Sequence, residues 1–71
     1  MTINLFKDCS EIELKTIWIN YKKSKEEKRP CEQLRHFAKM YQVMLSLYEP
    51  EAMKLATEQF FEEIAERKFN S

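Results

Sequence analysis

Residues 30–48 read PCEQLRHFAKMYQVMLSLY, and this stretch decides the fold. Its apolar residues recur at helical spacing, which predicts a helix from about Pro30 to Tyr48. The spaced residues are Leu34, Phe37, Ala38, Tyr41, Met44, Leu45 and Tyr48, and a second apolar row follows at Met40, Val43 and Leu47. Only Arg35, Lys39, Gln42 and Ser46 form a polar strip. A helix that is apolar around most of its circumference has to be covered on most sides.

The second apolar row, Met40, Val43 and Leu47, cannot be buried by two neighbouring helices alone. In a bundle of three short helices, each helix contacts two others and exposes its back to solvent. The simplest further cover is a second copy of the chain. We therefore predict a homodimer that forms through Met40, Val43 and Leu47, with Ile12 and Ile19 as further contributors. The alternative is that this helix is the central one and is covered by the N-terminal arm of its own chain.

The 71 residues include no glycine, which two-residue hairpins, type II turns and phosphate-binding loops require. Helices joined by short links fit such a chain best. A polar run that ends in Pro30 and the sequence Tyr48-Glu49-Pro50 mark the two links. We predict an all-α fold, a compact three-helix bundle with short proline-marked connections, in a single domain over residues 1–71. The helices are expected near 9–27, 30–48 and 50–68, with residues 1–8 as an arm or an early turn.

The first helix has two candidate N-caps, Asp8 and Ser10, each followed three residues later by a glutamate, and we expect it to start between residues 8 and 11. Its core stripe is Leu14, Ile17, Trp18 and Tyr21. Ile12 and Ile19 fall on a different face, near lysines. They therefore either reach a second neighbour or stay partly exposed.

The third helix combines a buried face with an acidic one. Met53, Ala56, Phe60 and Ile64 are expected on the buried face, with Phe61 beside them. Glu51, Glu58, Glu62 and Glu66 line up on the opposite face around Leu55. Like charges four residues apart destabilise a helix, so we interpret this face as a docking strip for a basic protein partner. The alternative is an ordinary solubilising surface.

Charge is segregated along the chain, although twelve basic and twelve acidic residues give a formal net charge of zero. Residues 22–29 carry five basic residues, Lys22, Lys23, Lys25, Lys28 and Arg29, against two glutamates, a net charge of +3. Residues 49–66 carry six glutamates against Lys54, a net charge of −5. The alternative function is therefore a nucleic-acid-binding regulator, in which a dimer places two basic segments side by side. Against it, Trp18 and Tyr21 belong to the core, and the third helix would repel phosphates.

The residues that carry catalytic or metal chemistry are few. His36 has no partner at metal-ligand spacing, and the glutamates are expected on surface faces, so we predict no enzymatic activity, no metal and no cofactor. Cys9 and Cys31 are expected at opposite ends of an antiparallel helix pair, which excludes a disulfide and agrees with a reducing cytoplasm. Cys31 follows basic residues at a helix start, where redox sensitivity is the alternative to a small structural residue.

No run of 18 apolar residues exists and the N-terminus lacks a basic start followed by an apolar core, so we expect no membrane association and a cytoplasmic location. The excess of residues with AT-rich codons suggests a bacterial or phage source. We therefore predict a small non-enzymatic regulatory or adaptor module that acts by protein–protein interaction.

Overall fold

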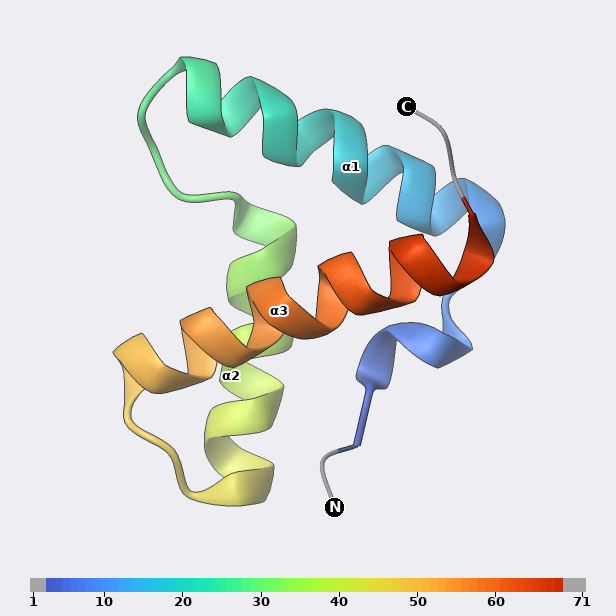
Figure 1. Cartoon of the computed structure of the whole chain (residues 1–71). Coiled ribbons are helices and arrows are strands. Elements are labelled where there is room, and N and C mark those ends of the chain that lie inside the picture. Colours follow the sequence, from blue (N-terminus) through green and yellow to red (C-terminus); the bar gives the residue numbers. More distant parts are fainter. Residues whose placement is uncertain (1–2, 69–71) are drawn as a thin grey trace.

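The computed structural model describes residues 3–68 and confirms the all-α fold (Figure 1). A short 3₁₀ helix, η1 (Leu5–Asp8), precedes three α-helices: α1 (Glu11–Glu26), α2 (Glu32–Leu45) and α3 (Glu49–Arg67). No strand occurs within residues 3–68. The early turn expected within residues 1–8 is therefore η1, whereas residues 1 and 2 lie outside the described part of the chain.

Ser10, and not Asp8, caps α1. The Ser10 hydroxyl accepts a hydrogen bond from the Glu13 backbone N–H at 3.1 Å, and the Ser10 N–H donates to Glu13 Oε1 at 2.9 Å. This reciprocal pair is a capping box, which satisfies two of the backbone donors at the start of a helix. The pKa of Glu13 is lowered, first because the Ser10 backbone N–H donates to its carboxylate and second because the Ser10 side chain lies beside it.

The chain makes left-handed turns without glycine. Lys28, Ser46 and Lys68 have φ angles of 56°, 53° and 58°, and each follows the end of a helix. A side chain with a Cβ in this conformation costs about 1–2 kcal/mol, a cost that glycine avoids. Because Ser46 turns the chain in this way, α2 ends at Leu45, and Leu47 and Tyr48 lie in the link instead of the expected helix.

One helix, α2, crosses the other two steeply (Figure 1). Figure 1 shows α1 and α3 running in roughly opposite directions, while α2 runs steeply across both. The molecule is flat as a result, with principal extents of 32 × 28 × 14 Å. This differs from the side-by-side antiparallel pair expected of the first two helices. Since α1 lies across the start of α2, it leaves the last turns of α2 uncovered (Figure 1).

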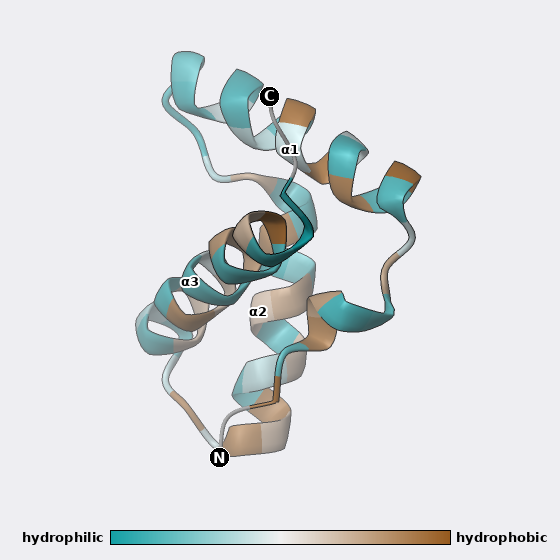
Figure 2. Cartoon of the chain, turned by 45° about the vertical axis from the view of Figure 1, so that its right-hand side comes forward, coloured by the Kyte–Doolittle hydropathy of each residue, from teal (hydrophilic) through white to brown (hydrophobic). Residues whose placement is uncertain are grey.

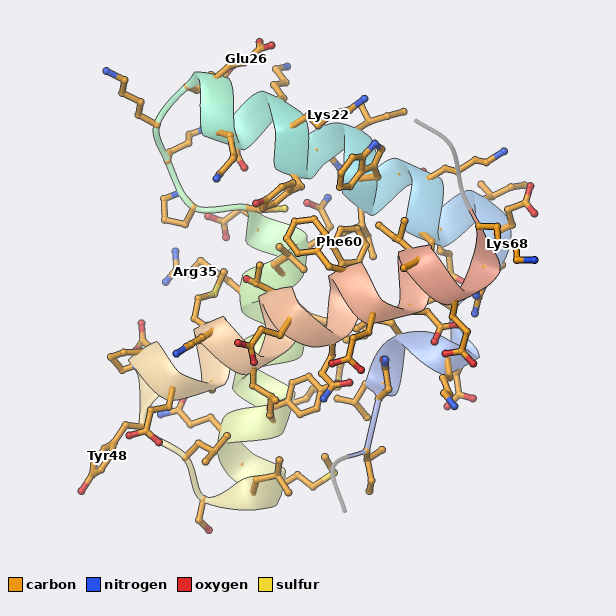
Figure 3. The ribbon with its side chains drawn as sticks, in the orientation of Figure 1. Lys22, Glu26, Arg35, Tyr48, Phe60 and Lys68 are labelled. Carbon is orange, nitrogen blue, oxygen red and sulfur yellow. The ribbon has the colours of Figure 1, made fainter. Side chains whose placement is uncertain are left out.

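The core forms where α2, α3 and η1 meet. Phe60 of α3 lies at its centre, with its ring 5.3 Å from Phe6 of η1 and 6.2 Å from Trp18 of α1 (Figure 3). Such tilted ring pairs stabilise a core beyond the area that they bury. The buried residues are Phe6, Leu14, Ile17, Cys31, Leu34, Ala38, Tyr41, Ala52, Ala56 and Phe60. Three of them are alanines of α2 and α3, whose small side chains let the two helices pack closely.

Candidate interaction surfaces

The N-terminal arm, residues 3–9, packs against both α2 and α3. Phe6 is fully buried and its ring stacks on Phe37 of α2, with centroids 4.1 Å apart. The Asn4 side-chain amide donates to the Gln59 carbonyl at 3.1 Å, and the Leu5 N–H donates to the Tyr41 hydroxyl at 2.9 Å. The arm therefore covers one side of α2, which is the alternative that the sequence left open.

Tyr41 is the point where this arm meets α2. Its side chain is fully buried, and burial raises the pKa of its phenol; the Glu62 carboxylate acts in the same direction, whereas the hydrogen bond from Leu5 opposes both. The phenol is thus held neutral and accepts the backbone hydrogen bond of Leu5.

Arg67 of α3 also holds the arm in place, a contact that the sequence did not predict. The Arg67 guanidinium donates to Glu63 Oε2 at 2.7 Å, to the Lys7 carbonyl at 2.9 Å and to the Phe6 carbonyl at 3.3 Å. Glu63 is only 5% exposed, which corrects the expectation that the glutamates lie on surface faces. The four-residue spacing of Glu63 and Arg67 favours an ion pair on one helix, but spacing carries no information about its burial. The signal was the position of Glu63 seven residues after Ala56, on the buried side of α3.

Even with the arm in place, the end of α2 exposes large apolar side chains. Val43 is 84% exposed, Met40 38% and Met44 43%, while Leu47 is half-buried against the core. Tyr48 is 78% exposed and points away from the molecule (Figure 3). The expectation that Met44, Leu45 and Tyr48 lie on a covered face was therefore wrong, because α1 lies across the start of α2 and does not reach this end (Figure 1). Figure 2 shows hydrophobic residues along these turns of α2 and in the arm beside them.

Ile12 and Ile19 do not join that surface. They are 78% and 60% exposed on the outer side of α1, opposite the buried Leu14 and Ile17. Figure 1 shows α1 at the start of α2, whereas Val43 is near the other end of that helix, which finishes at Leu45. The residues predicted for self-association thus form two separate surfaces.

The acidic residues of α3 form a continuous strip on one side of that helix. Glu51, Glu58, Glu62 and Glu66 are all exposed, and none of them has an ion pair within the described residues 3–68. Leu55, in the middle of the strip, is half-buried and packs against the core. We call these five residues the acidic strip.

Two shallow grooves follow the acidic strip along the whole of α3. The first, which we call the α2 groove, has a volume of about 400 Å³ and is lined by Leu45, Leu47, Glu51, Lys54, Leu55 and Glu58. The second, the arm groove, has a volume of about 690 Å³ and is lined by Ile3, Asn4, Lys7, Asp8, Gln59, Glu62 and Glu66. Together the α2 groove and the arm groove join the acidic strip to apolar side chains.

The basic residues of the segment 22–29 lie at the end of α1 and in the following loop. All five are exposed, but three have partners within the chain. Lys22 lies over the Trp18 ring and Lys25 over the Tyr21 ring, with each ammonium about 5.5 Å from the ring centroid, and Arg29 pairs with Glu27 at 2.7 Å. Trp18 and Tyr21 themselves pack against the core, as predicted.

The two cysteines are free thiols. Cys31 is buried, and its sulfur donates to Gln33 Oε1 at 3.6 Å. The pKa of Cys9 is raised, first by burial and then by the nearby Glu13, Asp8 and Glu63 carboxylates, against the opposing effect of Arg67. Cys9 is therefore a poor nucleophile at neutral pH. Among residues 3–68, no three His, Cys, Asp or Glu side chains are grouped closely enough to hold a metal ion.

Comparison with models of protein families, with curated proteins and with solved structures found no match. In the described part of the chain, no helix combines the length and the apolar character needed to cross a bilayer.

Proposed function

We propose that the protein is a small non-enzymatic regulatory or adaptor module of the cytoplasm that acts by protein–protein interaction. It self-associates through the end of α2, and it docks a basic protein through the acidic strip of α3. The free thiols of Cys9 and Cys31 agree with a reducing compartment.

The exposed end of α2 is the observation that carries this proposal. Val43, Met40 and Met44 lie within five residues on α2, and Tyr48 follows them in the link. Small soluble domains rarely leave large apolar side chains together in water unless these bind another surface. A second copy offers the same patch, so a two-fold contact would cover both at once.

Sedimentation velocity on the wild type and on Val43→Glu tests self-association. A charge at the most exposed position of the patch is expected to abolish the dimer without lowering the melting temperature, because Val43 contributes little to the core. Gln42→Glu is the matched control, since it introduces the same charge on the neighbouring residue but on the polar side of α2. A wild-type protein that remains monomeric at high micromolar concentration and 0.5 M salt would end this part of the proposal.

A nucleic-acid-binding regulator is the second candidate, and the exposure of all five basic residues in 22–29 favours it. The partners of Lys22, Lys25 and Arg29 within the chain, together with the acidic strip, favour a protein partner instead. Binding of a mixed-sequence DNA duplex across salt concentrations separates the two. A steep fall of affinity with salt, weakened by Lys23→Gln and Lys28→Gln, supports the nucleic-acid role, whereas no binding at low salt dismisses it.

A further inference from the structure

A surface that is complementary to the acidic strip lies on the same chain. The outer face of α1 consists of Ile12 and Ile19, both exposed, with Lys15 and Lys22 on one side and Lys23 on the other. It is apolar along its middle and basic along its edges. We propose that the outer face of α1 in one copy docks on the acidic strip and its two grooves in another copy. This inference rests on the proposed docking function of α3 and names its occupant.

The charges of the two faces are complementary. The residues of the acidic strip and the two grooves include five carboxylates, of Glu51, Glu58, Glu62, Glu66 and Asp8, against two lysines, Lys7 and Lys54, a net charge of −3. The outer face of α1 carries Lys15, Lys22 and Lys23 against Glu26 and against Glu11, which pairs with Lys15 at 3.1 Å, a net charge of +1. Opposed charges of this kind steer association and select the register of the contact.

The dimensions also agree. The acidic strip spans 16 residues from Glu51 to Glu66, with a rise of about 22 Å between its end residues, and α1, also of 16 residues, is about 24 Å long. Ile12 and Ile19 are seven residues apart, about 10 Å along α1. The α2 groove accompanies residues 51–58 of α3 and the arm groove residues 59–66, so their centres are about 12 Å apart. The spacing therefore allows one isoleucine to face each groove, where the apolar contacts are Leu45, Leu47 and Leu55 in the α2 groove and Ile3 in the arm groove.

A helix suits these grooves better than an extended segment does. The walls are helices and the arm, and most of their backbone groups already bond within the fold. An extended chain gains its affinity mainly from backbone hydrogen bonds to a sheet edge, whereas a helix satisfies its own backbone and binds through one side of its surface.

The two faces cannot meet within one molecule. Phe60 and Phe61 of α3 contact Trp18 and Tyr21 of α1, so α1 lies on that side of α3. Glu58 and Glu62 are each two residues from Phe60, about 200° around the helix, and point away from α1. One contact between two copies therefore leaves one free face of each kind. Such head-to-tail contacts build open chains or rings, and not closed two-fold dimers.

A mixing experiment tests the inference, and every variant in it carries Val43→Glu so that contacts through α2 do not contribute. The first protein adds Glu58→Lys and Glu62→Lys, which disable the acidic strip. The second adds Ile19→Glu and Lys22→Glu, which disable the outer face of α1. All changed positions are exposed, and far-UV circular dichroism checks that each protein folds.

We expect each disabled protein alone to sediment as a monomer in 50 mM salt. Their equimolar mixture is expected to give a one-to-one heterodimer, because each supplies the face that the other lacks. The Val43→Glu parent should form larger, concentration-dependent species, with association at least ten-fold weaker in 500 mM salt. Glu58→Gln with Glu62→Gln serves as a milder second version. Glu27→Gln with Glu32→Gln is the control, because it makes an equal charge change at exposed positions outside both the acidic strip and the outer face of α1.

A mixture that stays monomeric at high micromolar concentration overturns the inference. A synthetic lysine- and leucine-rich helical peptide then separates the two ideas. If the acidic strip binds this peptide and loses it on Glu58→Lys with Glu62→Lys, docking by α3 stands and the second copy is the wrong occupant. If the acidic strip binds neither the second copy nor the peptide, the proposed docking function of α3 fails as well.

Discussion

Replacing Arg67 by methionine should remove most of the stability of this domain. The change keeps an apolar stem but takes away the ion pair with Glu63 and the hydrogen bonds to the Lys7 and Phe6 carbonyls. Hydrogen bonds to charged groups contribute about 1.5–3 kcal/mol each, and breaking a buried ion pair costs about 3–5 kcal/mol. Because 24% of the Arg67 side chain is exposed, we expect the lower end, about 3 kcal/mol. A single core of this size supplies about 3–5 kcal/mol in all.

The physical reason is the carboxylate that stays behind. Glu63 Oε1 already has no hydrogen-bond partner within the described residues, and Arg67→Met leaves the whole buried group without one. Glu63→Leu alone also loses the pair but leaves no buried charge, so the double variant should be more stable than the sum of the two losses predicts. We expect a coupling of about 1–3 kcal/mol. Loss of the Arg67 hydrogen bonds to the arm should also speed hydrogen exchange at the Leu5 amide, which donates to the Tyr41 hydroxyl.

Urea unfolding followed by Trp18 fluorescence and circular dichroism measures all four proteins of this cycle. Trp18 is a suitable probe because its ring packs against Phe60 and Phe61. A cost below about 1 kcal/mol for Arg67→Met, or strict additivity of the two changes, would refute the view that the arm is held by a buried charge pair.

Four further outcomes are expected. Ser10→Ala removes the capping box of α1 and should cost about 1 kcal/mol at pH 7. Glu13→Gln tests the titrating half of the capping box: the folded-state pKa of Glu13 is lowered, so the contribution of its carboxylate is present above the unfolded pKa and is lost as the pH falls through the folded value. The urea midpoints of Glu13→Gln and wild type should therefore converge at acid pH and not at neutral pH. Ser46→Gly removes the Cβ from a residue in the left-handed conformation, and should stabilise the domain by about 0.5–1 kcal/mol in thermal unfolding. A loss of stability would show that Ser46 is not strained. Cys9 should react with iodoacetamide more slowly than free cysteine at pH 8, because its pKa is raised; equal rates would contradict this, and mass spectrometry of the alkylated peptide separates it from Cys31.

Local patterns were enough to place most of the first helix. Leu14 and Ile17 are buried, and Trp18 and Tyr21 pack against the core, because the spacing of apolar residues within one helix selects the side that faces inward. The same reasoning was less accurate for α3. Met53 and Ile64 are only partly buried, and Phe61 is 38% exposed, whereas Ala52, Gln59 and Glu63 lie fully inside. The buried side of α3 is thus rotated toward α2 and the arm.

The candidate surfaces were predicted in part. The acidic strip follows from the spacing of the glutamates on α3, and the structure adds the grooves beside it, which are built from the end of α2 and the arm. Exposure of Val43 agrees with its place in the second apolar row. Met44 and Tyr48 belong to the first apolar row of residues 30–48, and their exposure could not be predicted from that spacing. It depends on where α1 crosses α2.

The amino-acid sequence by itself determined that the chain forms three helices, where the links lie and which face of α1 is apolar, because caps, prolines and side-chain periodicity act over a few residues. Only the tertiary structure decided the steep crossing of α2, the docking of Phe6 and the burial of Glu63. These features depend on contacts between residues up to 61 positions apart, such as Arg67 with Phe6. Periodicity within one helix carries no information about such partners, whereas packing of the whole chain selects them.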